Sequence, residues 1–334
     1  MDSWSVSRQA AQVVTVPVEG TSVGQVSGSV RLGVGGVLLF GNRAPADLRG
    51  QLRALTAQAP GGIKPFVMSD EEGGGVQRLR NLVGELPWAR SLAATRTPAQ
   101  VRLLAADTAR RLLALGVDMD LAPVLDLDAG PGPDARHPAG RRSFSSNPAV
   151  AARYGTAFAA GLRDGGVVAV VKHFPGLGSA SYNTDFGSAS VSSLARLQRA
   201  DLTPFRAAIA AGVPAVMVSH ARVPGLSALP ASLSAEAVGG LLRGRLGFHG
   251  LVVTDSLSAE AVRAAGFGVT AGGVRALQAG SDLLLYGPAG AAAPRTAREL
   301  IAAVVEAVRS GQLPASRLRD AVRHILAAKH VAGC

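Results

Sequence analysis

The sequence has very little cysteine, few aromatic residues and no long apolar segment. The only cysteine among the 334 residues is Cys334, which excludes an internal disulfide and a cysteine-rich metal site. Aromatic residues make up 4% of the chain and hydrophobic residues 48%, so Ala, Val and Leu must build the core. Gly or charge interrupts the apolar runs within about ten residues, whereas a membrane-spanning helix needs roughly 20. We therefore expect no membrane span.

Export signals and metal-ligand patterns are also missing. The first ten residues, "MDSWSVSRQA", have neither a basic start nor an apolar middle, so we expect a cytoplasmic protein. A leader removed from the amino terminus would instead indicate a secreted or cell-envelope protein. The six histidines show no metal-ligand spacing, and we expect neither a metal nor a cofactor.

The net charge of +11 raises the question of a nucleic-acid partner, but the basic residues are not clustered. Almost all of them are Arg, scattered through Ala-rich helical segments such as "DTARRLLALG" and "RELIAAVVEAVRSG". No basic run alternates with aromatic residues, as nucleic-acid-binding surfaces often require. The charge is typical of a solvated surface rich in Arg, and we expect no nucleic-acid partner.

Short apolar runs, most of them nearly continuous in Val, Leu and Ile, recur along the chain. This pattern predicts strands that are buried on both faces, as in a parallel sheet. The runs cover residues 12–18, 35–40, 65–70, 117–127, 167–174, 215–220, 251–256 and 281–286.

Helical patterns separate most of these runs, and many of them end in Gly, a common helix stop. They cover residues 46–59, 98–116, 148–166, 201–212, 234–247 and 269–280. Eight strands that alternate with helices predict an α/β fold, a TIM-like (β/α)₈ barrel in a single domain. We expect this domain to span residues 1–334 with its core at about 10–330. A doubly wound open sheet is the structural alternative, although "GVGGV" at 33–37 precedes a strand and therefore favours a turn over a dinucleotide site.

Polar side chains stand at or just after the carboxyl ends of the expected strands. In a barrel these ends open on one face, which carries the active site. A single such residue is most often a cap or a loop contact, so the indication comes from the whole group. Its members are Asp70, Asp126, Lys172, His173, His220 and Asp255.

Several segments resemble glycoside hydrolase family three in their order and spacing. They are "GVGGVLLFGN", "SDEEGGGVQRL", "LAPVLDLD", "GRRSFSSNP", "VVKHFPGLG" and "LVVTDSLSAEAV". They are most similar to the single-domain bacterial β-N-acetylglucosaminidases (β-hexosaminidases) of cell-wall turnover. The resemblance implies a TIM-like barrel that acts on N-acetylglucosamine-containing oligosaccharides, and we expect the chain to be a monomer. The implied reaction removes terminal β-linked N-acetylglucosamine from muropeptide or chito-oligosaccharide fragments with retention.

The resemblance also implies roles for particular residues. Asp255 matches the nucleophile, which a retaining glycosidase needs to form a covalent glycosyl intermediate. Asp70 matches the acceptor of sugar hydroxyl groups, because one carboxylate can accept two hydroxyl hydrogen bonds. The remaining sugar-binding donors of the family correspond to Arg78, Arg142, Lys172 and His173.

The loop after "VVKHFPG" departs from the family pattern K-H-F-P-G-H-G-D-T-x-x-D-S-H. Leu177 stands in place of the first His, Ser179 in place of the first Asp, and Asp185 in place of the last His, the acid/base imidazole. Three readings of Asp185 remain open. It is the general acid/base itself, it contacts a sugar hydroxyl while another group supplies the proton, or the chain only binds sugar.

Two further departures from the family pattern lie in the segment after Asp70. The choice of sugar is a separate question. Glu71 replaces a Gln and Gly75 replaces an Arg that are common in the family. No residue in the sequence clearly recognises an acetamido group, so a β-glucosidase or xylosidase is an alternative activity. A catalytically impaired sugar-binding module of the same fold is the alternative of a different class.

Overall fold

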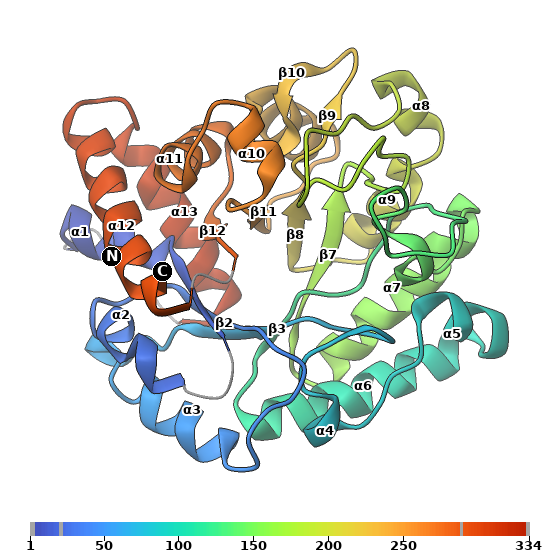
Figure 1. Cartoon of the computed structure of the whole chain (residues 1–334), viewed down its shortest axis with the longest axis horizontal. Helices are drawn as coiled ribbons and strands as arrows, with labels where there is room; N and C mark the ends of the chain where they lie inside the picture. The colour runs from blue at the N-terminus through green and yellow to red at the C-terminus, as the bar shows by residue number, and fades with distance from the viewer. Residues whose placement is uncertain (1–3, 20–22, 288–289, 332–334) are drawn as a thin grey trace.

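The computed structural model describes residues 4–19, 23–287 and 290–331, so Cys334 lies outside the described part. Eight parallel strands stand at the centre of the molecule with helices around them (Figure 1). In order around the sheet they are β1 (Thr15–Val18), β2 (Gly36–Leu39), β3 (Phe66–Ser69), β6 (Met119–Asp120), β7 (Val168–Phe174), β8 (Ala215–Val218), β11 (Leu251–Ser256) and β12 (Leu283–Leu285).

The first and last strands also meet, and this closes the sheet. Val14, just before β1, pairs in parallel with Leu284 of β12, whose amide N–H donates to the carbonyl oxygen of Val13 at 2.8 Å. A doubly wound sheet would leave these two edges open. The (β/α)₈ barrel predicted from the alternating pattern is therefore confirmed, and the open-sheet alternative is wrong.

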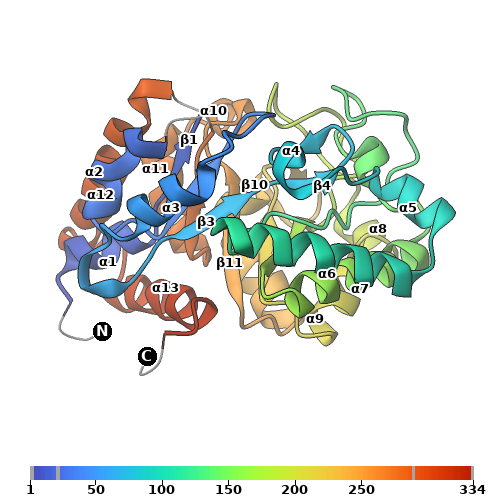
Figure 2. The ribbon, with the colours of Figure 1, turned by 90° about the horizontal axis from the view of Figure 1, so that it is seen from below.

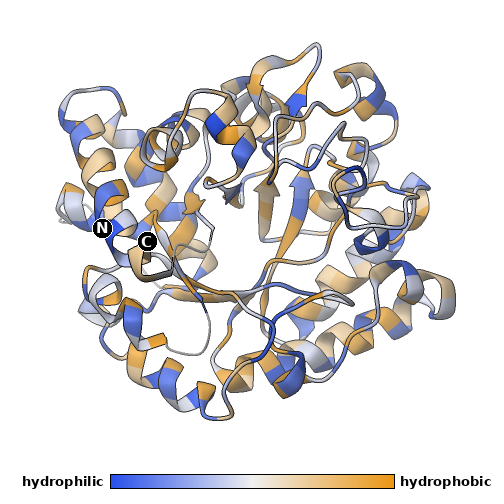
Figure 3. Ribbon diagram, viewed as in Figure 1, coloured by the Kyte–Doolittle hydropathy of each residue, from blue (hydrophilic) through white to orange (hydrophobic). Residues whose placement is uncertain are grey.

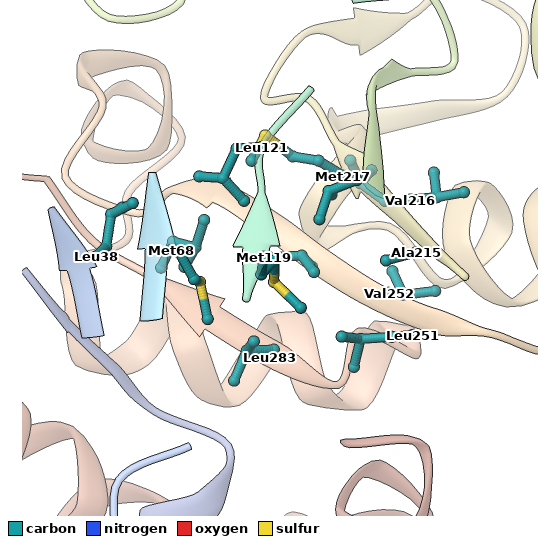
Figure 4. Packing of buried hydrophobic residues seen from close by; sticks show 14 of the residues in the cluster. Leu38, Met68, Met119, Leu121, Ala215, Val216, Met217, Leu251, Val252 and Leu283 are labelled. Atoms are coloured by element: carbon teal, nitrogen blue, oxygen red, sulfur yellow. The ribbon is translucent and has the colours of Figure 1, made fainter. Parts of the chain in front are cut away.

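The strands are buried on both faces, which explains their continuous apolar sequences. The residues of β1, β2, β3 and β8 are all buried. Inside the barrel, Met68, Met119 and Met217 from three different strands lie among Leu and Val side chains (Figure 4). Unbranched Met side chains fill such irregular spaces well. The barrel is thus a packed core rather than a pore.

The helices begin and end at the signals that the sequence carries. Thr97 caps α6 with a capping box to Gln100, and Gly116 ends the helix in a left-handed conformation with φ of 94°. The α-helices are α1 (Val6–Gln12), α2 (Ser27–Arg31), α3 (Leu48–Thr56), α4 (Arg80–Val83), α5 (Ala89–Thr95), α6 (Pro98–Leu115), α7 (Pro148–Asp164), α8 (Leu194–Arg199), α9 (Leu202–Ala210), α10 (Glu260–Ala264), α11 (Val269–Ala279), α12 (Ala293–Arg309) and α13 (Ala315–Ala328).

Helices α6 and α7 run side by side on the outside of the barrel (Figures 1 and 2). Gly161 allows this approach, because a Cβ atom there would lie 2.3 Å from the carbonyl oxygen of Arg102. Their buried faces are rich in Ala and cover the strands, whereas polar residues face outward (Figure 3). Within the described residues, no helix combines the length and apolarity that crossing a bilayer requires.

Two segments differ from their predicted form. Of residues 117–127 only β6, Met119–Asp120, is a regular strand, because Pro123 has no N–H to donate to a neighbouring strand. The chain beyond it still accepts hydrogen bonds from β7 at Ala122 and Pro123. Residues 234–247, expected to be an ordinary helix, contain a π-helix over Glu236–Arg245.

Two small two-stranded sheets lie after β3 and β8. The first, β4 (Glu71–Gly73) with β5 (Val76–Gln77), forms a hairpin directly after β3. The second pairs β9 (Arg222–Val223) with β10 (Ser227–Pro230). Because both follow carboxyl ends of barrel strands, they extend the face on which a barrel places its active site.

Candidate active site

A cavity of about 280 Å³ opens at the carboxyl ends of the barrel strands. Its size is near the lower end of the roughly 300–1,000 Å³ range of small-molecule sites, which suits one small ring better than a long ligand. All of the residues predicted to act in catalysis or sugar binding line it: Asp70, Arg78, Arg142, Lys172, His173, Asp185 and Asp255. Apolar side chains complete the wall, among them Leu38, Phe40, Leu121, Met217 and Leu285.

A chain of ion pairs joins the polar residues of the wall. Lys172 Nζ lies 2.7 Å from Asp70 Oδ1 and 2.6 Å from Glu72 Oε1. Arg142 donates from Nε to Glu72 Oε2 at 2.7 Å and from a second nitrogen to Oε1 at 2.8 Å. Arg78 extends the chain, with its guanidinium 3.6 Å from the other oxygen of Asp70. Glu72 is therefore the centre of the network.

The ion pairs of this network keep Glu72 and Lys172 charged. Burial by itself raises the pKa of Glu72, but the cations of Arg142 and Lys172 outweigh it and hold that pKa far below its usual range. Burial likewise acts against the positive charge of Lys172, and the carboxylates of Asp70 and Glu72 still raise the pKa of the ammonium group. At neutral pH the wall therefore presents fixed charges, with oxygen acceptors and N–H donors close together. Such an arrangement suits the hydroxyl groups of a sugar.

His173 is held in a single orientation at the end of β7. Its Nδ1 lies 2.7 Å from Asp126 Oδ2, and its backbone N–H donates to Asp126 Oδ1 at 3.2 Å. The same Oδ1 accepts from the backbone N–H of Leu177 at 2.6 Å. Asp126 thus fixes both the ring and the start of the following loop. The other ring nitrogen of His173 lies 3.3 Å from Arg142.

Asp255 stands near the end of β11 and is half-buried. Its Oδ1 accepts from the backbone N–H of Ser256 at 2.7 Å. Burial raises the pKa of Asp255, but the charges of His173 and His220, together with that hydrogen bond, outweigh it and the pKa falls below its usual range. His220 also fixes the strand end, since Nε2 lies 2.8 Å from the carbonyl oxygen of Ser256 and Nδ1 lies 2.7 Å from Ser232 Oγ.

The loop that carries Asp185 leaves β7 with an irregular backbone. Gly176 adopts φ of 122°, and a Cβ on Gly178 would lie 1.9 Å from the carbonyl oxygen of Leu127. Only glycine fits such conformations and approaches without strain. These two glycines let the loop bend tightly over the segment that follows β6.

Backbone hydrogen bonds then tie the tip of this loop to two neighbouring segments. Asn183 N–H donates to the carbonyl oxygen of Ala135 at 2.8 Å. On the other side, Glu260 N–H and Ala261 N–H, at the start of α10, donate to the carbonyl oxygens of Asp185 and Thr184. Because α10 follows the strand of Asp255, these contacts bring the loop carboxyl to the cavity that Asp255 lines.

Asp185 differs from Asp255 in its electrostatic surroundings. Asp185 as a whole is exposed. Desolvation at the cavity and the nearby charge of Asp255 nevertheless raise the pKa of its carboxyl. Among the described residues, no side-chain or backbone donor hydrogen-bonds to that carboxyl group. The pKa of one carboxyl of the cavity is thus raised, while the pKa of the other is lowered.

Nearly the whole chain matches one known protein family. The family described as "Glycosyl hydrolase family 3 N terminal domain" matches this chain over residues 20–328. The chain belongs to glycosyl hydrolase family 3. "Beta-hexosaminidase LpqI" of Mycobacterium tuberculosis is 40% identical over 299 residues, which cover 87% of this chain and 74% of that protein.

Solved structures of family 3 proteins agree. The Beta-N-acetylhexosaminidase from Beutenbergia cavernae superposes with a TM-score of 0.89 at 34% identity, covering 98% of this chain and 99% of the other. A family 3 glycosyl hydrolase from Mycobacterium smegmatis gives a TM-score of 0.88 at 35% identity, covering 98% and 97%. This family 3 chain is a glycosidase, and its substrate is a carbohydrate.

The sequence did not nominate every residue on which this family 3 site depends. Glu72 was missed because "DEEGG" offers three successive acids, and nothing in the sequence tells which one faces the cations. Asp126 and His220 were noted only as polar residues at strand ends. Neither lines the cavity, and each instead positions a residue that does. Among the described residues, no cluster of His, Cys, Asp or Glu is arranged to hold a metal ion.

Proposed function

We propose that this family 3 glycosidase removes terminal β-linked N-acetylglucosamine from muropeptide or chito-oligosaccharide fragments with retention of configuration. The observation that carries the proposal is the pair Asp185 and Asp255, which share one cavity and have pKa shifts of opposite direction. Two carboxyls whose surroundings push their pKa values apart can act as an acid and a nucleophile at the same pH.

In the first step the carboxylate of Asp255 attacks the anomeric carbon and the glycosidic C–O bond breaks. Asp185 gives its proton to the departing oxygen, so the leaving group departs as a neutral alcohol. In the second step ionised Asp185 takes a proton from water, whose oxygen attacks the same carbon and displaces Asp255. Two inversions at one carbon give net retention.

The wall around this pair supports sugar binding. Asp70 and Glu72 present acceptors, while Arg78, Arg142 and Lys172 present donors fixed by their ion pairs. The choice of N-acetylglucosamine comes from the relatives, two of which are named as a beta-hexosaminidase and a Beta-N-acetylhexosaminidase. Action as a monomer remains a prediction.

A panel of aryl β-glycosides tests activity and sugar preference together. We expect turnover of the N-acetyl-β-glucosaminide well above that of the glucoside and xyloside. Asp255→Ala should lower turnover at least roughly 10³-fold, because nucleophilic catalysis is lost. The anomer formed first, followed by proton NMR, should be β.

Other results of this panel would select the alternatives. Preference for the glucoside or xyloside would identify a different glycosidase. Equal background rates with the wild-type chain and Asp255→Ala would identify a sugar-binding module. An α anomer as the first product would exclude the proposed double displacement.

A further inference from the structure

Two acids lie beneath the active site and take no part in the mechanism above. Glu71 is the first residue of β4, and Asp120 is the last residue of β6. Both are fully buried, and neither lines the cavity. The side chain of Asp120 contacts the backbone of Glu71, whose N–H donates to Asp120 Oδ1 at 2.9 Å.

One oxygen of Glu71 closes the base of the β4–β5 hairpin. Its Oε1 accepts from Ser69 Oγ at 2.6 Å, from Arg78 N–H at 3.1 Å and from Leu79 N–H at 2.9 Å. These donors come from the residues just before and just after the hairpin. The hairpin carries Asp70 and Glu72 at its start and Arg78 at its end, so Glu71 fixes the spacing between sugar-facing residues on its two arms.

The other oxygens of this pair have no partner. Glu71 Oε2 and Asp120 Oδ2 are both buried, and neither makes a hydrogen bond to any described residue. A buried carboxylate oxygen without a donor is costly, and two neighbouring carboxylates also repel each other. A proton lowers both costs, because it removes the repulsion between the two charges and turns one carboxyl from an acceptor alone into a donor as well.

We propose that Glu71 and Asp120 form a proton-holding carboxyl pair that positions the β4–β5 hairpin and, through it, Asp70, Glu72 and Arg78. Glu71 is a positioning residue in this arrangement, since it acts on the substrate only through the hairpin. Loss of the proton leaves buried negative charge at the base of the hairpin, next to Asp70, and weakens the geometry of the sugar-binding wall.

The surrounding charges agree with this assignment. Burial, with a contribution from Asp70, raises the pKa of Glu71 to about 7 despite its three hydrogen bonds. Burial and the charge of Glu71 raise the pKa of Asp120 well above its usual range, although Lys172 of β7 opposes the shift. The charged groups near the pair are thus Asp70 and Arg78 at the two arms of the hairpin and Lys172 on the barrel wall.

The substitution Glu71→Gln removes the titratable proton of this side chain and keeps its shape. The amide keeps a carbonyl oxygen for the three donors and carries an N–H₂ group in place of the acid proton. In the wild-type chain the raised pKa of Glu71 means that stability is lost as pH rises from its unfolded value of 4.5 to about 7. We expect the melting temperature of E71Q relative to wild type to increase over this interval.

Activity supplies the second measurement, and only this part rests on the proposed function. At one pH unit above its pKa, about a tenth of Glu71 remains protonated. Between about pH 6 and about pH 8 we therefore expect E71Q to retain up to about tenfold more of its kcat/KM than the wild type. E71L, which lacks the oxygen for Arg78 and Leu79, should be destabilised at every pH.

Asp118→Asn is the matched control. Asp118 is another poorly solvated acid, whose burial raises its pKa to about 6, but it lies at the opposite end of the barrel and accepts from Val67 N–H. D118N should change the pH dependence of the melting temperature and leave that of kcat/KM unaltered.

Two results would overturn the inference. Superposable melting curves of E71Q and wild type across this pH range would show that Glu71 holds no proton. A stability difference with identical pH–activity profiles in E71Q and wild type would show that the pair does not position the hairpin. If the chain hydrolysed no β-glycoside, the proposed function would fail, whereas the melting curves would still decide whether the proton is present.

Discussion

The two carboxyls proposed for catalysis belong to regions of opposite character. Asp255 stands on β11, a strand of the barrel wall, with His173 and His220 nearby and its own strand end fixed by His220. Asp185 stands on the loop after β7, and backbone hydrogen bonds to Ala135 and α10 hold the tip of that loop. The wall supplies the backbone N–H of Ser256 and the charge of Lys172, which help to lower the pKa of Asp255, whereas no described donor binds the carboxyl of Asp185. The same side chain can therefore serve two chemical roles.

Besides the loss of the nucleophile, the largest effect should come from removing the loop carboxyl. Asp185→Ala should lower kcat/KM on substrates with poor leaving groups by about 10²- to 10⁴-fold, the usual contribution of a general acid. Activated aryl glycosides need little protonation and should lose far less. Steady-state kinetics over a series of leaving groups measures the difference. Equal losses across the series would mean that Asp185 only contacts the substrate.

Removing a carboxylate from the cavity wall should lower the stability of the fold. Glu72→Gln leaves Lys172 and Arg142 buried without their shared carboxylate, and we expect a loss of about 3–5 kcal/mol in the free energy of unfolding. Because the pKa of Glu72 is depressed, this difference from wild type should be largest above its unfolded value of 4.5 and shrink as pH falls below it.

Urea unfolding of wild type and E72Q at several pH values measures this loss. Glu85→Gln is a matched control, because the side chain of Glu85 is 76% exposed and pairs loosely with Arg80. It should change stability by less than about 1 kcal/mol. A loss in E72Q as small as that in E85Q would mean that the ion-pair network contributes little.

The pH profile should separate the two carboxyls on a finer scale. The proposed mechanism needs Asp255 ionised and Asp185 protonated, so kcat/KM should fall below the depressed pKa of Asp255 and above the raised pKa of Asp185. In Asp185→Ala, measured with an activated aryl glycoside, the alkaline decline that depends on Asp185 should disappear while the acidic decline remains. An unchanged alkaline decline would assign it to another group.

The smallest effect concerns the molecule that accepts the glycosyl group in the second step. A carboxylate in place of the family's imidazole should repel inorganic phosphate, so adding phosphate should leave turnover unchanged apart from its ionic strength. Sodium chloride of matched ionic strength is the control. Faster turnover with phosphate, and a sugar phosphate as product, would contradict this expectation.

Much of the fold and part of the site follow from local patterns. Continuous Val and Leu runs specify buried strands, and Thr97, Gly116 and Asn147 specify helix ends through their own backbone contacts. The residues at strand ends were predictable because parallel strands place their carboxyl ends on one face. Pro123 shows the limit of the pattern, since an apolar run suggested a longer strand than a residue without an N–H allows.

The sequence alone thus determined the barrel and the face on which its polar residues gather, since strand alternation and helix caps are local properties. Only the tertiary structure decided which acids are charged. Among Asp70, Glu71 and Glu72, three consecutive carboxyls, one ends up buried without cations and another between Arg142 and Lys172. Their protonation depends on burial and on charges more than 60 residues away along the chain, which no neighbouring residue encodes.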